Sequence, residues 1–195
     1  MRGVRDEPAI VARHQDAIKL ATTIRGEAMS SNRTLQTLSA RNAVLVDVDG
    51  TLCDVSGIRH YVESDPRHRN FDKFHRASAL CPAIASTVDC VREQHAAGIT
   101  VIVVTSRKQQ YEHLTRVWLR KWGVPFDRLL FRADHDERRD DLVKADLLAK
   151  IRAEGYEVIA AIDDNPSIIA LWESEGIPVT IVPGWNDPVP DIRDA

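Results

Sequence analysis

The chain has 195 residues, 44% of them hydrophobic, and a formal net charge of −3. These values are typical of one globular domain with its own core, and they exclude nucleic-acid binding through a strong overall positive charge. Three cysteines without a shared ligand spacing argue against a disulfide framework or a zinc site, and favour a reducing, cytoplasmic location. Since no apolar run approaches the ~20 residues that span a bilayer, we expect no membrane association.

The first 42 residues carry a helical pattern. Apolar side chains recur at helical spacing between Pro8 and Met29, which predicts an N-terminal helical extension over residues 1–42. Three alternatives are open for this extension: packing on the main domain, pairing with a second chain, or fraying. Met29 precedes a polar stretch and is an alternative start of the protein. The sequence leaves the oligomeric state open.

A predicted buried strand leads into two closely spaced acids. Residues 43–46 are aliphatic and β-branched, as in a parallel strand that is covered on both faces. Asp47 and Asp49 follow at its carboxyl end, where open α/β sheets bind ligands. Gly50 allows the backbone to turn away sharply. One carboxylate can attack an electrophile while the other moves a proton; the alternative is a simple strand end followed by a turn.

Residues 54–80 form a long polar segment before the next predicted helix. Arginine, lysine and histidine predominate there, with Tyr61, Phe71 and Phe74 interleaved. This mixture suits a single-stranded nucleic acid, because cations pair with phosphates and aromatic rings stack on bases. Long segments of this kind inside compact domains are usually functional, so we expect a small cap-like insertion that guides a substrate. The alternative is a solvated insertion in which the aromatic rings are anchors.

Strands and helices alternate through the rest of the chain. The alternation predicts an α/β fold with right-handed crossovers, in which three α/β/α layers surround a central parallel sheet. This domain spans residues 43–183, with an irregular tail at 184–195. Helical periodicity places Val117 and Leu142 in the core, and the tryptophans are also expected there. The expected helices cover residues 82–97, 109–122, 138–154 and 166–175, and the expected later strands cover residues 99–104, 126–131, 158–162 and 178–182.

The polar clusters that follow the first, second and fourth strands meet at one edge of such a sheet, and their composition suits phosphoryl transfer. Asp47 can attack phosphorus, while Asp49 can protonate the leaving oxygen and later activate water. Thr105 follows the second strand and offers a hydroxyl and an N–H to a phosphate oxygen. Lys144 offers a positive charge to the same group, although a surface helix lysine is the alternative reading.

Several carboxylates in one pocket repel a phosphate unless a cation lies among them. Hard oxygen ligands together with a phosphate favour Mg²⁺. We expect Asp47, Asp49, Asp163 and Asp164 to hold this ion. For the last two, the alternative is a turn that caps the following helix.

These motifs resemble those of the haloacid dehalogenase (HAD) superfamily of phosphatases. Asp47-Val48-Asp49-Gly50-Thr51 is similar to its first motif, Val103 to Ser106 to its second, Lys144 to its third, and Ile162-Asp163-Asp164 to its fourth. The resemblance covers residues 43–182 and implies a HAD-like, Rossmannoid fold.

A narrower resemblance is to the 3′-phosphatase domain of bacteriophage-type polynucleotide kinase-phosphatase. It extends to Arg59, to Arg107, and to the run Arg138 to Lys144. It implies that Asp47 is the nucleophile and Asp49 the acid/base. By the same resemblance, Arg59 and Arg107 are needed for phosphatase activity. Asp140 and Lys144 support phosphate binding, and the acid of the fourth motif binds Mg²⁺. The predicted substrate-binding residues are Arg59, Ser106, Arg107 and Asp140.

The resemblance implies a Mg²⁺-dependent phosphatase that removes a 3′-phosphate at a DNA or RNA end, and it leaves a 2′,3′-cyclic phosphate open as an additional substrate. Its chemistry would pass through an aspartyl phosphate, in the manner of nucleic-acid repair enzymes. The sequence contains no P-loop pattern, so we expect no 5′-kinase activity and leave a separate kinase or ligase partner open.

Two other functions are compatible with the sequence. The first is a small-molecule HAD phosphatase such as a nucleotidase, which differs from a polynucleotide enzyme because only the latter should bind its substrate progressively less well as salt rises. The second is a binding module that has the fold without turnover, and the intact set of acids, hydroxyl and lysine argues against it.

Overall fold

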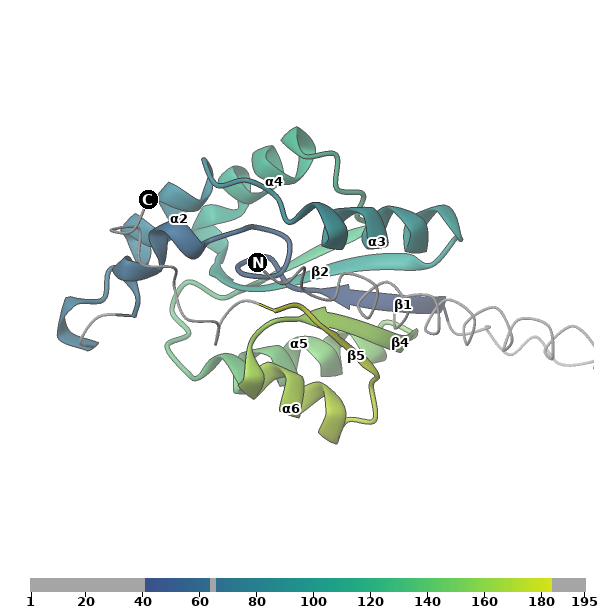
Figure 1. The fold of residues 1–195 in the computed structure, drawn as a ribbon. Coiled ribbons are helices and arrows are strands. Elements are labelled where there is room, and N and C mark those ends of the chain that lie inside the picture. Colours follow the sequence, from purple (N-terminus) through teal and green to yellow (C-terminus); the bar gives the residue numbers. More distant parts are fainter. Residues whose placement is uncertain (1–40, 64–65, 184–195) are drawn as a thin grey trace, which may run out of the picture. The chain divides into compact units, whose positions relative to one another are not determined.

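The computed structural model describes residues 41–63 and 66–183, so the expectations for residues 1–40, for Met29 and for the tail at 184–195 lie outside the described residues. Five parallel strands form one sheet in the order β3-β2-β1-β4-β5 (Figure 1). The central strand begins at Arg41, two residues before the expected start of the domain. The strands are β1 (Arg41–Val46), β2 (Thr100–Lys108), β3 (Arg128–Arg132), β4 (Tyr156–Asp163) and β5 (Val179–Ile181).

Helices cover both faces of the sheet, as Figure 1 shows. This arrangement confirms the predicted three-layer α/β/α fold with a central parallel sheet. None of the helices among the described residues is long and apolar enough to span a membrane. The helices are α3 (Ala85–Ala96) and α4 (Glu112–Lys121) on one face, and α5 (Asp140–Ala153) and α6 (Pro166–Ser174) on the other.

The central strand β1 is apolar because both of its faces are buried. Val44 and Val46 pack into the core that includes Val91 of α3 and Trp118 of α4. Leu45, pointing the other way, packs into the core that α5 and α6 complete. Successive side chains of a strand point to opposite faces, so the aliphatic run supplies both cores. The register is thereby fixed up to the residue where the acids begin.

Two core expectations are wrong. Val117 on α4 and Leu142 on α5 are each 49% exposed. On α5 the buried residues include Val143 and Lys144 instead. Lys144 is therefore buried on the face of α5 where the hydrophobic pattern had placed Leu142. Periodicity alone cannot show that a lysine, and not a leucine, points inward.

The helix expected from Pro82 begins three residues later, at Ala85. Pro82 and Ile84, which were expected to be helical, instead form hydrogen bonds with the start of the 54–80 insertion. The carbonyl of Pro82 accepts a hydrogen bond from the N–H of Asp54 at 2.9 Å, and the N–H of Ile84 donates to the carbonyl of Leu52 at 2.8 Å. These bonds hold the residues before α3 in an extended bridge and close the insertion at its base.

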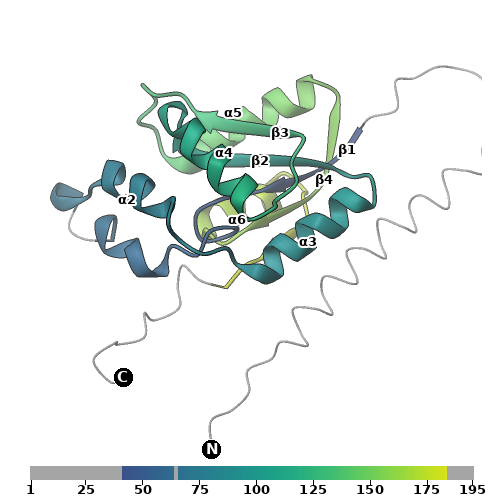
Figure 2. The ribbon, with the colours of Figure 1, turned by 90° about the horizontal axis from the view of Figure 1, so that it is seen from above.

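Residues 54–80 form a helical insertion rather than a continuous loop. Figure 2 shows it beyond one end of the sheet, around the helix labelled α2. Asn70 caps α2, because its side chain accepts a hydrogen bond from the N–H of Lys73 at 2.9 Å. The chain is anchored to the core where the insertion ends, since the indole N–H of Trp118 donates to the carbonyl of Cys81 at 2.9 Å. The described helices here are η1 (Ser56–Tyr61), η2 (Pro66–His68) and α2 (Phe71–Ser78).

Replacing Trp118 with Phe should lower the free energy of unfolding by about 1–3 kcal/mol, because the buried carbonyl of Cys81 loses its donor. Urea denaturation of the two proteins measures this difference. Trp122→Phe is the matched control, since the indole N–H of Trp122 is buried without a hydrogen-bond partner among the described residues. A Trp122→Phe loss as large as that of Trp118→Phe would show that ring volume, and not the hydrogen bond, carries the effect.

Candidate active site

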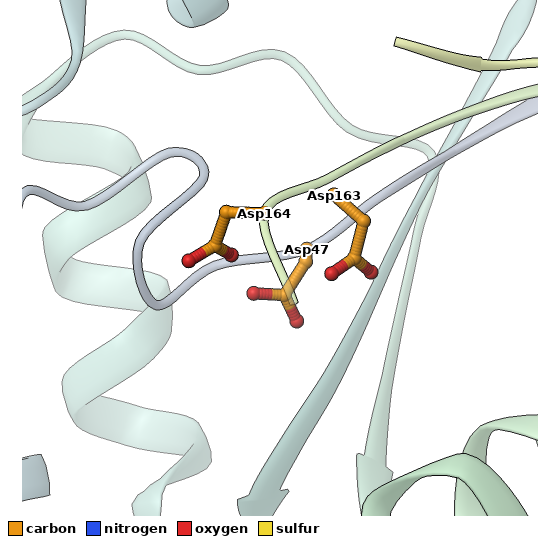
Figure 3. Close-up of side chains that lie close together, drawn as sticks. All are labelled: Asp47, Asp163 and Asp164. Atoms are coloured by element: carbon orange, nitrogen blue, oxygen red, sulfur yellow. The ribbon is translucent and has the colours of Figure 1, made fainter. Parts of the chain in front are cut away.

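Three carboxylates meet at the carboxyl edge of the sheet. Asp47 directly follows β1, Asp163 ends β4, and Asp164 comes next. Because β1 and β4 are hydrogen-bonded neighbours, the parallel strands deliver these side chains to one place. Each of the three offers a carboxylate oxygen, and these atoms lie within 4.8 Å of one another; Figure 3 shows the group. All three residues are buried, so bulk salt screens their mutual repulsion only weakly.

Lys144 compensates part of this charge. Its Nζ lies 2.7 Å from Asp47 Oδ1 and 2.8 Å from Asp163 Oδ2. The lysine is 2% exposed, so the alternative reading of a surface lysine is wrong. Burial lowers the pKa of Lys144, but the charges of Asp163 and Asp47 outweigh burial and raise this pKa above its ordinary value. Burial also raises the pKa of Asp47, against the opposing charge of Lys144.

The turn after β1 is shaped to receive Asp164. Gly50 has a φ of +92°, which favours glycine, and a Cβ atom there would lie 2.0 Å from Asp164 Oδ2. Thr51 Oγ1 donates a hydrogen bond to Asp164 Oδ1 at 2.8 Å. Asp164 Oδ2 is buried without a hydrogen-bond partner in the described part of the chain. Burial raises the pKa of Asp164 to about 6, despite the hydrogen bond from Thr51.

The three carboxylates fit a hard divalent cation. One ammonium group faces three acids, and unpaired buried charge is costly. The orphaned oxygen of Asp164 marks where a further positive group would be stabilised. All the candidate ligand atoms are carboxylate oxygens, which suits Mg²⁺. Asp47, Asp163 and Asp164 would hold the ion, whereas the fourth expected ligand, Asp49, is not part of this group.

Asp49 pairs instead with Arg107. The guanidinium Nε donates to Asp49 Oδ2 at 2.8 Å and Nη2 donates to Oδ1 at 2.6 Å. Arg107 Nη1 donates to Thr115 Oγ1 on α4 at 3.0 Å. Burial alone would raise the pKa of Asp49, but the charge of Arg107 and its hydrogen bonds outweigh burial and lower this pKa. Although Arg107 is a predicted substrate-binding residue, its guanidinium is occupied in orienting Asp49.

Two hydroxyl groups follow the buried part of β2. Thr105 Oγ1 accepts a hydrogen bond from the backbone N–H of Arg107 at 3.2 Å, and its own O–H remains able to donate. Ser106 Oγ is buried and lacks a hydrogen-bond partner within residues 41–63 and 66–183. Both residues lie on the wall of the cleft described below. Such hydroxyl groups are suited to bind phosphate oxygens.

Arg132, at the end of β3, organises the loop before α5. Its Nε donates to the carbonyl of Ser106 at 3.0 Å, and its Nη1 donates to the carbonyl of Arg138 at 2.6 Å. Its Nη2 donates to the carboxylate of Asp140, a predicted substrate-binding residue. Arg132 is not among the site residues predicted from the sequence. It could have been found, because Arg132 is a polar residue directly after the predicted strand 126–131. The other polar clusters were identified by the same criterion.

A cleft of about 750 Å³ lies between these groups and the insertion. Arg59 is not on its wall: the residue is 5% exposed, and its Nε lies 3.8 Å from Glu63 Oε1. Asp163 and Asp164 are not on the cleft wall either. They belong to the site because their carboxylates lie close to that of Asp47 and because Asp163 contacts Lys144. The predicted site residues on the cleft wall are Asp47, Asp49, Thr105, Ser106, Arg107, Asp140 and Lys144.

Replacing Lys144 with Met should lower the free energy of unfolding by about 3–5 kcal/mol without a divalent cation, because two buried carboxylates lose their shared partner. Added Mg²⁺ should recover part of this loss. Thermal or urea denaturation with and without Mg²⁺ measures both effects. Lys150→Met is the control, because Lys150 is an exposed lysine on the same helix. A Lys144→Met protein as stable as this control would contradict the proposed charge balance.

Comparisons with known proteins agree with this geometry. Residues 41–184 match the family described as "Polynucleotide kinase PNKP phosphatase domain". A relative from Autographa californica nuclear polyhedrosis virus, assigned as a bifunctional polynucleotide kinase/RNA ligase, is 30% identical over 138 residues. The match covers 70% of this chain but only 18% of the viral protein.

Solved structures show the same fold. A chain of the Pnkp1/Rnl/Hen1 complex is 25% identical, with a TM-score of 0.64, over 78% of this chain and 50% of that one. The class C acid phosphatase from Bacillus anthracis is 14% identical, with a TM-score of 0.63, over 94% of this chain and 80% of that one. The family match spans the strands and all the acids described above. The chain therefore belongs to the family of PNKP phosphatase domains, which have the HAD-type fold.

Proposed function

We propose that this protein removes the 3′-phosphate from DNA or RNA ends in a Mg²⁺-dependent reaction. The observation that carries the proposal is the buried group of Asp47, Asp163, Asp164 and Lys144 beside a cleft whose wall includes Asp47 and Lys144, within a chain that matches the PNKP phosphatase family. A phosphate dianion needs positive charge and donors around a carboxylate nucleophile. The site supplies the carboxylate at the end of β1 and the positive charge from α5.

The reaction follows from the placement of Asp47 and Asp49, the two acids of the first motif. A carboxylate oxygen of Asp47 forms a bond to phosphorus, the bond between phosphorus and the 3′-oxygen breaks, and Asp49 gives its proton to that oxygen. Asp49 then takes a proton from water, whose oxygen attacks phosphorus and releases inorganic phosphate from Asp47. A bound Mg²⁺ would neutralise charge on the phosphoryl oxygens.

The residues around these acids have supporting roles. Lys144 holds Asp47 in place, and Thr105 and Ser106 can donate to phosphoryl oxygens. Arg107 favours the ionised form of Asp49, which suits removal of a proton from water. The approach of a phosphate dianion raises the proton affinity of the same carboxyl, which suits its role as an acid in the first step.

The polynucleotide substrate is supported by the relatives. The viral relative is assigned as a polynucleotide kinase/RNA ligase, and a structural neighbour belongs to the Pnkp1/Rnl/Hen1 complex. Hydrolysis of a 3′-phosphate leaves a 3′-hydroxyl, which is the end that a ligase joins. We infer that a kinase or ligase activity acts on the same nucleic acid.

Replacing Asp47 with Asn should abolish release of phosphate from a 3′-phosphorylated oligonucleotide with Mg²⁺, by about 10⁴-fold or more, because the nucleophile is lost. A phosphate-release assay on the purified protein measures the rate. The oligonucleotide with a 5′-phosphate in place of the 3′-phosphate is the substrate control, and the wild-type protein should leave it intact. Turnover by Asp47→Asn would refute the assigned nucleophile, and release of only the 5′-phosphate by wild type would refute the proposed substrate.

Replacing Arg107 with Lys should lower kcat by about 100-fold on an oligonucleotide 3′-phosphate and on a small aryl phosphate alike. Lysine cannot form the two parallel hydrogen bonds that orient Asp49, and both substrates need the acid/base. Steady-state kinetics on the two substrates measure this effect, with Arg116→Lys, a partly exposed position on α4, as the control. A loss confined to the oligonucleotide would assign Arg107 to strand binding instead.

A further inference from the structure

We propose that Phe71, His75 and Tyr111 form a subsite for the base of the terminal nucleotide, whose 3′-phosphate lies at Asp47. All three line the cleft that also exposes the nucleophile. The inference rests on the proposed function and adds to it the feature of the substrate that the protein recognises.

The aromatic face of α2 is incompletely covered. Phe71, Phe74, His75 and Ser78 are spaced so that they share one face of the helix. The last three are buried, whereas Phe71 is 55% exposed. A large ring at the end of an otherwise buried face, on the wall of a cleft, is positioned to stack on a planar ligand.

His75 continues this surface toward the catalytic groups. It is 8% exposed, and its Nδ1 is buried without a hydrogen-bond partner among the residues that the structure describes. Burial lowers the pKa of His75 to about 4, so the imidazole is neutral near pH 7 and can accept or donate a single hydrogen bond. A neutral ring on the wall of the cleft adds to the planar surface against which a base can pack.

Tyr111 supplies the third ring, which lies next to His75. Its hydroxyl donates to Asp72 Oδ1 at 2.7 Å, which ties the segment before α4 to α2. The ring centroids of His75 and Tyr111 are 4.8 Å apart, and those of Phe71 and His75 are 6.3 Å apart. The three rings are therefore neighbours, and the hydrogen bond holds the surface together.

Several cations of the cleft are already paired with acids. Lys108 forms an ion pair with Glu137, Arg132 with Asp140, and Arg138 with Asp136 and Asp146. Because these charges are compensated within the protein, they are poorly placed to bind a run of backbone phosphates. Stacking tolerates any base, and the three rings offer this interaction to a strand end.

The test compares two oligonucleotides that differ only at the 3′-terminal phosphorylated nucleotide: one carries a base and the other is abasic. With the full-length wild-type protein and Mg²⁺, kcat/KM should be about 10-fold or more higher for the end that carries a base. Phe71→Ala should remove most of this preference through a higher KM, and leave hydrolysis of the abasic end unchanged. Phe71→Tyr should keep the preference, because the ring is retained.

Val117→Ala is the matched control, since Val117 is another half-exposed apolar residue but lies on α4 outside the cleft. It should change neither rate. Equal rates on both ends, or equal losses on both with Phe71→Ala, would overturn the base subsite alone and leave the proposed function intact. A protein that hydrolyses an aryl phosphate but neither 3′-phosphorylated end would overturn the proposed function and this inference together.

Discussion

A buried ammonium group between two carboxylates is the interaction on which the site depends. Lys144 reaches Asp47 and Asp163 from α5, while the acids come from neighbouring strands of the sheet. Without this charge, the carboxyl edge would bring together acids that repel one another at low dielectric. The same contact links one helical layer to the sheet. The stability of the fold and the charge of the site therefore depend on the same contact, and a further cation among the acids would balance the charge that remains.

Much of the fold could be predicted from the sequence because the aliphatic runs of the strands leave few alternatives. Buried parallel strands need apolar residues on both faces, and the acids that end β1 and β4 then have to meet. The helix expected over residues 166–175 is also present as α6, because its start is set by local signals: Asn165 caps it and Pro166 is its first residue. These elements need no knowledge of distant contacts.

The misses have a common physical cause: they involve contacts between segments far apart in the chain. The role of Arg107 depends on Asp49, 58 residues away, and that of Arg132 depends on the carbonyl of Ser106, 26 residues away. Composition also suggested that the cations of residues 54–80 face a nucleic acid. Arg59 is instead buried in η1. A sequence pattern shows which residues are charged, but it does not show which of them are neutralised by partners.

The insertion is fastened where it leaves the core and where it returns. Backbone hydrogen bonds join Asp54 to Pro82 and Ile84 to Leu52, and the indole of Trp118 holds Cys81. The two ends of the insertion are therefore fixed to the same part of the core, so the wall of the cleft that it forms is attached at a single base.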